Sequence, residues 1–252
     1  MNKKRVFLNV LYPVLAATVV FLIWLIAAKT ENNPLVLPYP KEVLERFFVL
    51  WKEKNFWRGL FGTIGRTFLC FAISFAFAIV FAVISELFDP AKRFLAPVVS
   101  VLRSAPTVAV ILILYAFMPA KKMSIVVGFL IGFPVLYSSF SSALGSVDKK
   151  LITMSKIYDV PTVRRITGIY VPSVLPMVFD ASRSTLSLTL KVVIAAEILT
   201  LVPVSLGGKI QTAYASFEIE YLLAWTLLTV VISYVLELLV AALKFFSVRW
   251  SR

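Results

Sequence analysis

Long uncharged apolar runs are the feature that most constrains the fold of this chain. Residues 6–28 and 123–147 contain no charged side chain. An α-helix needs about 20 mostly apolar residues to cross a bilayer core of roughly 30 Å, so each run is long enough to span a membrane. The chain is 60% hydrophobic and 15% charged, whereas an ordinary soluble domain is about 45–50% apolar and about 25% charged. The sequence therefore predicts an all-α integral membrane protein.

The apolar pattern predicts about six transmembrane helices within a single domain, residues 1–252. The expected spans are residues 6–28, 62–85, 94–119, 123–147, 174–202 and 221–243. The first run is too long for a signal peptide and lacks a small-residue cleavage site, so we expect it to be retained. The third span is unusual, because it contains Pro97, Arg103, Pro106 and Pro119.

The segment 29–58, between the first two spans, is more polar. Its first part is turn-rich, and residues 41–57 mix charges with apolar residues at helical spacing. This pattern predicts an amphipathic helix that lies at the membrane interface.

The basic residues predict how the chain is oriented. Six spans place both termini on one side, and cytoplasmic loops carry an excess of Lys and Arg. The side that holds the termini would carry the basic residues of segments 3–5, 92–93, 149–165 and 244–252. We therefore expect both termini to be cytoplasmic and segment 29–58 to be extracytoplasmic.

The residues that are missing exclude several functions. The chain has one cysteine, Cys70, and no histidine, so it cannot form an internal disulfide or use imidazole chemistry. No glycine-rich phosphate loop is present, so the chain is not an ATPase by itself. The net charge of +13 is spread between apolar runs, which favours contact with anionic lipid headgroups over nucleic acid. Cys70 is expected to serve helix packing.

The polar segment 148–172 interrupts the apolar pattern. Asp148 is a good N-cap for a helix of about three turns, and the helix should stop near Asp159, because Pro161 disfavours helical conformation in the residue before it. A second short helix should then begin and carry Arg164 and Arg165. Such a helix–break–helix segment on the cytoplasmic side suits the docking of a partner; the alternative is a solvated connecting loop.

At this point the sequence resembles the membrane-spanning permease subunits of ATP-binding-cassette (ABC) importers, in the branch for nitrate, taurine, aliphatic sulfonates and thiamine precursors. The cytoplasmic loop of that family reads Glu-Ala-Ala, three residues, Gly, nine residues, Ile-x-Leu-Pro. Anchored on Ile169–Pro172, the family glycine falls on Asp159 and the Glu-Ala-Ala on Thr153–Ser155. The end of the motif is retained and its beginning is replaced.

Four further motifs, in the family order, extend the resemblance to roughly residues 35–250. They are Leu37–Val43, similar to Pro-Ser-Pro-x-x-Val; Thr63–Thr67, similar to Ser-Leu-x-Arg; Asp89–Pro106, similar to Pro-x6-Leu-Arg-x-x-Pro; and Ala196-Glu197 with Ser205–Gly207, similar to Ala-Glu…Gly-Leu-Gly. Each motif is weak alone, but five in the right order are specific.

The resemblance implies a type I importer permease fold in which segment 148–172 is the coupling helix that seats on a cytoplasmic ABC ATPase. The residues carried over to that role are Thr153, Met154, Ser155, Lys156, Ile157, Tyr158, Asp159, Arg164 and Arg165. Aspartate adopts the left-handed conformation less readily than glycine. We therefore expect either a turn reshaped with help from Pro161 or a matched, divergent ATPase.

The fifth span carries a polar stripe, since Asp180, Arg183, Ser184, Ser187 and Lys191 share one helical face. Charged residues should not face lipid, so Ser184, Ser187 and Lys191 are candidates to line a translocation path. The alternative is structural, with an Asp180–Arg183 pair and a Lys191 that snorkels or pairs with an acid elsewhere.

Glu197 and Arg103 are the other two candidates for the translocation path. Glu197 should lie near the outer end of the fifth span, either as part of a gate or as a helix-end contact. Arg103 either satisfies a carbonyl freed by Pro106 or braces the coupling loop. Glu237 is expected to contact a neighbouring helix.

The leading hypothesis is a homodimeric permease subunit of an ATP-driven importer in the bacterial plasma (inner) membrane, which carries a small polar solute. Its expected partners are two copies of a cytoplasmic ABC ATPase, an extracytoplasmic solute-binding protein and membrane lipid. No cofactor is expected in this chain, and ATP and Mg would bind the ATPase. The alternatives are an ion-coupled carrier that works without an ATPase and, less well supported by the residues present, a membrane-embedded enzyme.

Overall fold

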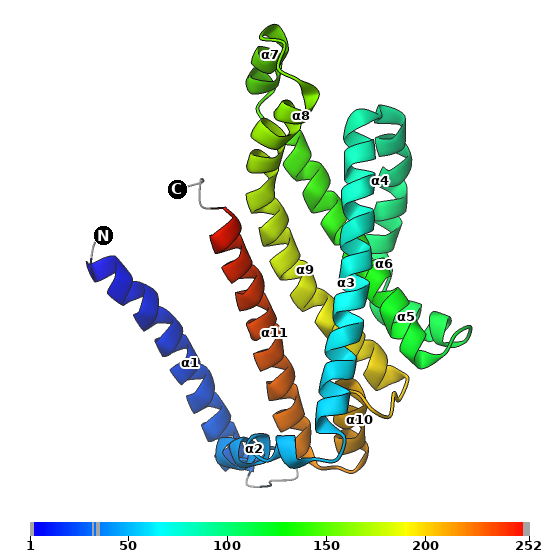
Figure 1. The fold of residues 1–252 in the computed structure, drawn as a ribbon. Helices are drawn as coiled ribbons and strands as arrows, with labels where there is room; N and C mark the ends of the chain where they lie inside the picture. Colours follow the sequence, from blue (N-terminus) through cyan, green and yellow to red (C-terminus); the bar gives the residue numbers. More distant parts are fainter. Residues whose placement is uncertain (1–2, 32, 34–35, 249–252) are drawn as a thin grey trace. The chain divides into compact units, whose positions relative to one another are not determined.

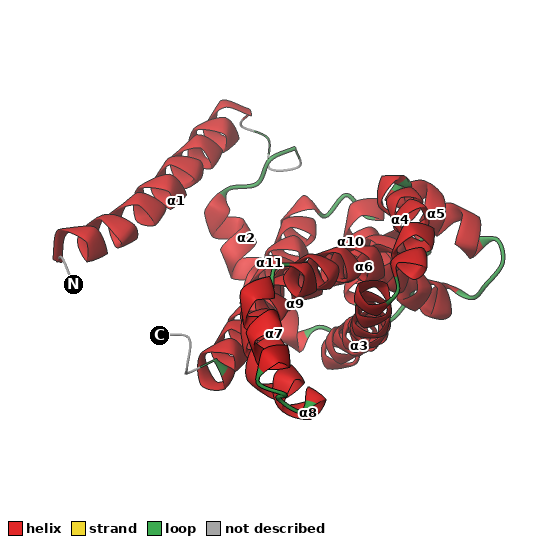
Figure 2. Ribbon diagram, turned by 90° about the horizontal axis from the view of Figure 1, so that it is seen from above, coloured by secondary structure: helices red, strands yellow, loops and turns green. Residues whose placement is uncertain are grey.

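The computed structural model describes residues 3–31, 33 and 36–248, and within these residues the secondary structure is helical, with no strand (Figures 1 and 2). The prediction of an all-α protein is confirmed. The long helices are α1 (Lys3–Glu31), α3 (Phe56–Leu87), α6 (Ala120–Gly145), α9 (Val171–Leu199) and α11 (Ile219–Ser247). The shorter ones are α2 (Pro40–Phe47), α4 (Asp89–Ser104), α5 (Thr107–Tyr115), α7 (Lys149–Ile157), α8 (Thr162–Arg165) and α10 (Leu206–Ala215).

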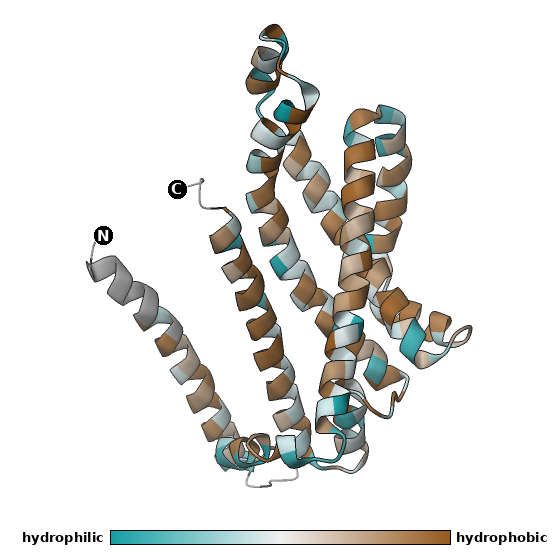
Figure 3. Ribbon diagram, in the orientation of Figure 1, coloured by the Kyte–Doolittle hydropathy of each residue, from teal (hydrophilic) through white to brown (hydrophobic). Residues whose placement is uncertain are grey.

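By length and composition, the described helices provide up to five of the six expected membrane crossings. Four of them, α1, α3, α6 and α11, are long and apolar enough to cross a membrane, and the bent pair α4–α5 would provide a fifth crossing. Helix α9 coincides with the expected fifth span and has 29 residues, but Asp180, Arg183, Lys191 and Glu197 interrupt its apolar character. In Figure 3 brown, apolar positions dominate α3 and α11, and teal positions recur in α7 and α8.

The third span differs from the expected single helix. Helices α4 and α5 are bent by 91° at the break between them. Pro106 lies in that break, where it is extended with a φ of −63° and a ψ of 116°. Proline has no backbone N–H to donate and disfavours helix in the residue before it, so the chain turns there. Pro97, by contrast, lies inside α4.

Residue contacts divide the chain into two compact units, although the sequence predicted a single domain. The first comprises Met1–Trp57 and Lys209–Thr229, and the second comprises Arg58–Gly208 and Val230–Arg252.

In the first unit, α2 and the segment after it are tied to the second stretch of chain by ion pairs. Arg46 donates to Glu220 over 2.7 Å, and Lys209 donates to Glu53 over 2.9 Å. The carboxylate of Glu220 raises the pKa of Arg46 by accepting this hydrogen bond. The amphipathic helix is shorter than the expected 41–57, because it gives way to a 3₁₀ turn, Leu50–Lys52.

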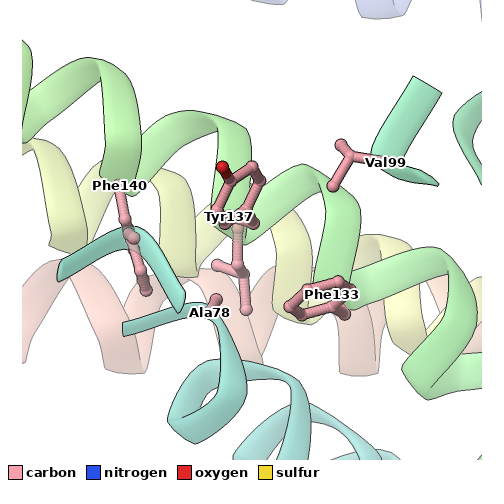
Figure 4. Close-up of a cluster of buried hydrophobic side chains, with 7 residues drawn as sticks. Ala78, Val99, Phe133, Tyr137 and Phe140 are labelled. Atoms are coloured by element: carbon pink, nitrogen blue, oxygen red, sulfur yellow. The ribbon is translucent and has the colours of Figure 1, made fainter. Parts of the chain in front are cut away.

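The second unit is built around α6, which packs along α9 and also against α4 and α5. Phe133, Tyr137 and Phe140 of α6 form a buried cluster with Ala78 of α3 and Val99 of α4 (Figure 4). Cys70 is buried where α3 meets Gly128 of α6, and a Cβ at Gly128 would lie 2.6 Å from the cysteine sulfur. Small residues of this kind allow helices in a membrane to approach closely.

Candidate coupling segment and polar contacts of the spans

The coupling segment, residues 148–172, has the predicted helix–break–helix form. The carboxylate of Asp148 accepts a hydrogen bond from the backbone N–H of Lys150 at 2.8 Å, so the expected N-cap is confirmed. Helix α7 ends at Ile157, and α8 begins at Thr162, directly after Pro161.

Asp159 keeps the left-handed conformation that the family motif assigns to glycine, with a φ of +49°. The turn closes through the N–H of Val160, which donates to the carbonyl of Ser155 over 2.9 Å. Asparagine and aspartate are the non-glycine residues that enter this region most readily. The left-handed turn is therefore present although its glycine is missing.

The exposed side chains of the coupling segment form an apolar surface. Ile157, Tyr158 and Val163 are each more than 70% exposed, and Met154 is 56% exposed. Large apolar groups exposed together mark a surface that binds a partner. Val163 was not among the residues predicted for docking, although it lies directly before Arg164, which was.

Three of the other predicted coupling residues form hydrogen bonds within the segment itself. Ser155 is buried and donates to the carbonyl of Ile152, and Thr153 donates to Lys149 of its own helix. Arg165 is half-buried and donates to the carbonyl of Val160. Lys156, Asp159 and Arg164 are exposed. Arg165 thus braces the loop, and a direct part in docking stays a prediction for the exposed residues.

A π-helical turn, Ile166–Tyr170, joins α8 to α9 without a break in the helix. The N–H of Val171 donates to the carbonyl of Ile166, five residues earlier. Pro172, which follows, lacks an N–H and would crowd the carbonyl four residues before it. The wider turn relieves that contact, and it links the coupling segment directly to the long helix α9.

Glu197 lies in a buried network at the other end of α9. Its side chain is fully buried, and one carboxylate oxygen accepts from Nε of Arg66 at 2.9 Å and from its Nη2 at 2.5 Å. The other oxygen accepts from Thr63 at 2.9 Å and from the backbone N–H of Gly207 at 3.1 Å. The Thr63 hydroxyl in turn accepts from the N–H of Leu206.

This network joins two of the sequence motifs, Thr63–Thr67 and Glu197 with Gly207. A Cβ at Gly207 would lie 2.5 Å from the Cβ of Glu197 and 2.6 Å from the carbonyl oxygen of Ile194, so only glycine fits. The contacts of Glu197 match the helix-end alternative. Arg66 was not a predicted site residue. Its position three residues after Thr63, near the end of a span, could have indicated that it pairs with an acid.

The polar stripe of α9 is largely used in contacts with α11. Lys244 donates to Asp180 at 2.6 Å, and Arg183 donates to Glu237 at 3.3 Å. The expected Asp180–Arg183 pair is therefore wrong, because each residue finds its partner on the neighbouring helix. The expectation that Glu237 contacts a neighbouring helix is confirmed.

The candidates for the translocation path differ in exposure. Ser187 is buried, with its hydroxyl 2.6 Å from that of Ser233 on α11, and its part in the translocation path stays a prediction. Ser184 is exposed and bonds to carbonyls of its own helix. Lys191 is exposed and forms no salt bridge within the described part of the chain. Arg103, on α4, is exposed and donates to Ser138 of α6 at 3.3 Å, rather than to the coupling segment.

Comparison with known proteins gives concordant matches. The family model of the binding-protein-dependent transport system inner membrane component matches residues 74–246. The taurine transport system permease protein TauC of Escherichia coli (strain K12) is 23% identical over 227 residues, which cover 88% of this chain and 82% of TauC.

Solved structures share the fold at low sequence identity. A bacterial ABC transporter involved in the import of the acidic polysaccharide alginate has a TM-score of 0.70 at 15% identity and covers 99% of this chain and 98% of its own. The MetNI methionine ABC transporter, in an inward-facing conformation, has a TM-score of 0.62 at 18% identity, with 74% of this chain and 93% of that chain covered.

Proposed function

This chain belongs to the family of binding-protein-dependent transport system inner membrane components, and on that premise we propose that it is the membrane-spanning permease subunit of an ATP-driven importer. The family consists of transport components and not of enzymes. In this proposal ATP and Mg bind a separate cytoplasmic ABC ATPase, present in two copies, and an extracytoplasmic binding protein delivers the solute.

The observation that carries the proposal is the coupling segment. Its apolar surface of Met154, Ile157, Tyr158 and Val163 lies beside the left-handed turn at Asp159. The π-helical turn then continues this segment into α9, which packs along α6. A displacement imposed at the segment would therefore act on two spans. Rigid-body motion of helix bundles of this kind underlies alternating access.

The remaining parts of the proposal rest on the family and on charge. We propose a homodimer, because one such subunit would supply half of a pathway, and we propose that both termini are cytoplasmic. The solute is a small polar molecule of the nitrate, sulfonate, taurine or vitamin-precursor class. The similarity to a taurine permease supports this range.

The test is ATP-driven uptake by the chain reconstituted with its ATPase and binding protein. Tyr158→Ala should abolish uptake and the capture of the ATPase in a pull-down, because a side chain 73% exposed contributes to docking and not to the fold. Phe246→Ala is the matched control, since that aromatic residue is 70% exposed outside the coupling segment.

Two results would contradict the proposal. Normal uptake by the Tyr158 variant would remove the docking assignment. Uptake that persists in vesicles without ATP or ATPase would favour the ion-coupled carrier instead.

A further inference from the structure

A cleft with several polar side chains lies between α4 and α6 and includes Arg103, which the sequence offered as a candidate for the translocation path. Its volume is about 560 Å³. Helix α4 lines it with residues that recur at helical spacing along one face, namely Lys92, Ala96, Val99, Ser100, Arg103 and Ser104. Helix α6 lines it with Tyr137, Ser138, Ser141 and Ser142.

The cleft carries positive charge without a compensating acid. No Asp or Glu is among its lining residues, and neither Lys92 nor Arg103 forms a salt bridge within the described ranges. Arg103 donates one hydrogen bond, to the hydroxyl of Ser138 at 3.3 Å. A guanidinium has five N–H donors, so most of its donor capacity is unused.

Several hydroxyl groups of the cleft are also available to a ligand. The side chains of Ser100, Ser141 and Ser142 make no hydrogen bond to any other described residue. Tyr137, by contrast, is held by a 2.8 Å contact with Ser85 of α3. The cleft thus has one aromatic side chain held in place, Tyr137, and guanidinium and hydroxyl donors that are free to bind a ligand.

The polar and charged face of α4 needs a polar group to contact within the membrane. A charged side chain at the bilayer centre costs about 2.5–3.5 kcal/mol on insertion scales, so charged residues in spans line cavities or pathways. The planar fork of arginine matches the oxygens of an oxyanion, to which it donates two parallel hydrogen bonds. The unpaired Arg103 with its hydroxyl neighbours therefore suits an oxyanion.

Lys92 and Arg103 lie at different positions along the cleft. They are eleven positions apart on α4, which corresponds to about 16 Å along the helix axis. A small anion held by Arg103 and the serines of α6 would meet Lys92 only on moving along the cleft. Arg103 is therefore the binding position and Lys92 a second, weaker position nearer the start of α4.

We infer that the α4–α6 cleft binds the transported solute through a sulfonate-type oxyanion, and that it favours a plain anion over a zwitterion. The absence of a carboxylate from the lining leaves an ammonium group on the solute without a partner, among cations. This inference rests on the proposed function, because it assigns the substrate class of the path.

The test is equilibrium binding to the purified full-length chain in phosphatidylcholine nanodiscs, without ATPase or binding protein. Saturation-transfer NMR on the methyl protons of ethanesulfonate detects weak binding, and taurine is the zwitterionic competitor. Ethanesulfonate should bind saturably and more tightly than taurine. Arg103→Gln should weaken binding about tenfold or more, since hydrogen bonds to charged groups contribute about 1.5–3 kcal/mol, and Arg103→Lys should retain part of the affinity.

The matched control is Arg93→Gln, which removes an exposed cation of α4 that does not line the cleft. It should leave binding unchanged, whereas Lys92→Gln should weaken it less than the change at Arg103. Equal binding by the wild type and Arg103→Gln, or taurine binding as tight as ethanesulfonate, would overturn the inference. So would loss of the signal in phosphatidylglycerol nanodiscs, which would assign the cleft to a lipid headgroup.

Failure here is separable from failure of the proposed function. Binding is measured without the ATPase, so a chain that binds ethanesulfonate but takes up solute without ATP would refute the importer proposal alone. A chain that supports ATP-driven uptake but shows no Arg103-dependent binding would refute the cleft alone.

Discussion

Two polar regions of the second unit, the stripe on α9 and the face of α4, have similar residues but different contacts. On α9, Asp180, Arg183 and Glu197 each have an ion-pair partner on another helix. On α4, Lys92 and Arg103 have none in the described chain. The sequence predicted most of the translocation path on the first region and Arg103 on the second. Cations without a salt bridge in the described chain lie on both, Lys191 on α9 and Lys92 and Arg103 on α4.

The difference separates polar groups that hold helices together from those that are free to meet a ligand. A buried charge is tolerated when it is paired and hydrogen-bonded, and Glu197 meets both conditions. A cation without a partner gains from a ligand of opposite charge. Changes to the paired groups should therefore alter stability, and changes to the unpaired groups should alter transport.

The largest effect on stability is expected for Glu197→Ala. The change leaves the guanidinium of Arg66, whose side chain is 13% exposed, largely buried without its carboxylate, and breaking a buried pair costs about 3–5 kcal/mol. The free energy of unfolding, measured by titration with sodium dodecyl sulfate in mixed micelles, should fall by that amount.

The double variant Glu197→Ala with Arg66→Met is the informative control. Replacing both charges by apolar groups is often close to neutral, so most of the lost stability should return. If the double variant is as unstable as the single one, the pair is not what holds α3 to α9.

The next effect is expected for Gly207→Ala, which tests the close approach beside Glu197. The added methyl group would collide with Glu197 and with the backbone of Ile194, and overpacking of this kind costs about 1–3 kcal/mol. The same unfolding titration measures it. Gly65→Ala is the control, because a Cβ there meets nothing within 4 Å and alanine favours helix by up to about 1 kcal/mol.

The helices could be predicted from the sequence, and the pairings between them could not. Apolar run length and proline positions indicated six spans, the break near Pro161 and the cap at Asp148. The contact of Arg66 with Glu197 joins residues 131 positions apart. It depends on the rotation of two helices about their own axes, which hydrophobic periodicity fixes only roughly.

In the candidate site, too, local features could be predicted from the sequence and contacts between helices could not. The coupling segment is local in sequence, and its turn could be inferred from a motif, even with Asp159 in place of glycine. The cleft combines α4 with α6, and the sequence indicated Arg103 as an intramembrane charge but not the serines of α6 that line the cleft with it. The π-helical turn had no predicted counterpart, because Pro172 alone does not say how a helix will accommodate it.

A smaller effect is expected for Ser187→Ala, which removes the buried contact with Ser233. Hydrogen bonds between helices in membranes average about 0.6 kcal/mol in double-mutant cycles, so the free energy of unfolding should fall by about that amount. A cycle with Ser233→Ala isolates the contact. Uptake should be unchanged, and a marked loss of uptake at wild-type stability would place Ser187 in the translocation path.

The smallest effect on stability is expected for Lys191→Leu, which tests whether a charge without a partner on α9 behaves like those on α4. Lys191 shares the helix of the paired residues, yet it is exposed and has no salt bridge in the described chain, so it resembles Arg103 more than Glu197. The unfolding titration should show no loss, because no side-chain hydrogen bond or ion pair within the described chain is removed and leucine is the better residue in an apolar environment. ATP-driven uptake should nevertheless fall, because a lone intramembrane cation faces a pathway or a second subunit and not lipid.

Lys191→Arg, which keeps the charge, should retain more uptake than Lys191→Leu. Unchanged uptake in the leucine variant would mean that exposure and missing partners do not identify a pathway residue, and the same reasoning for Arg103 would then rest on the binding measurement alone.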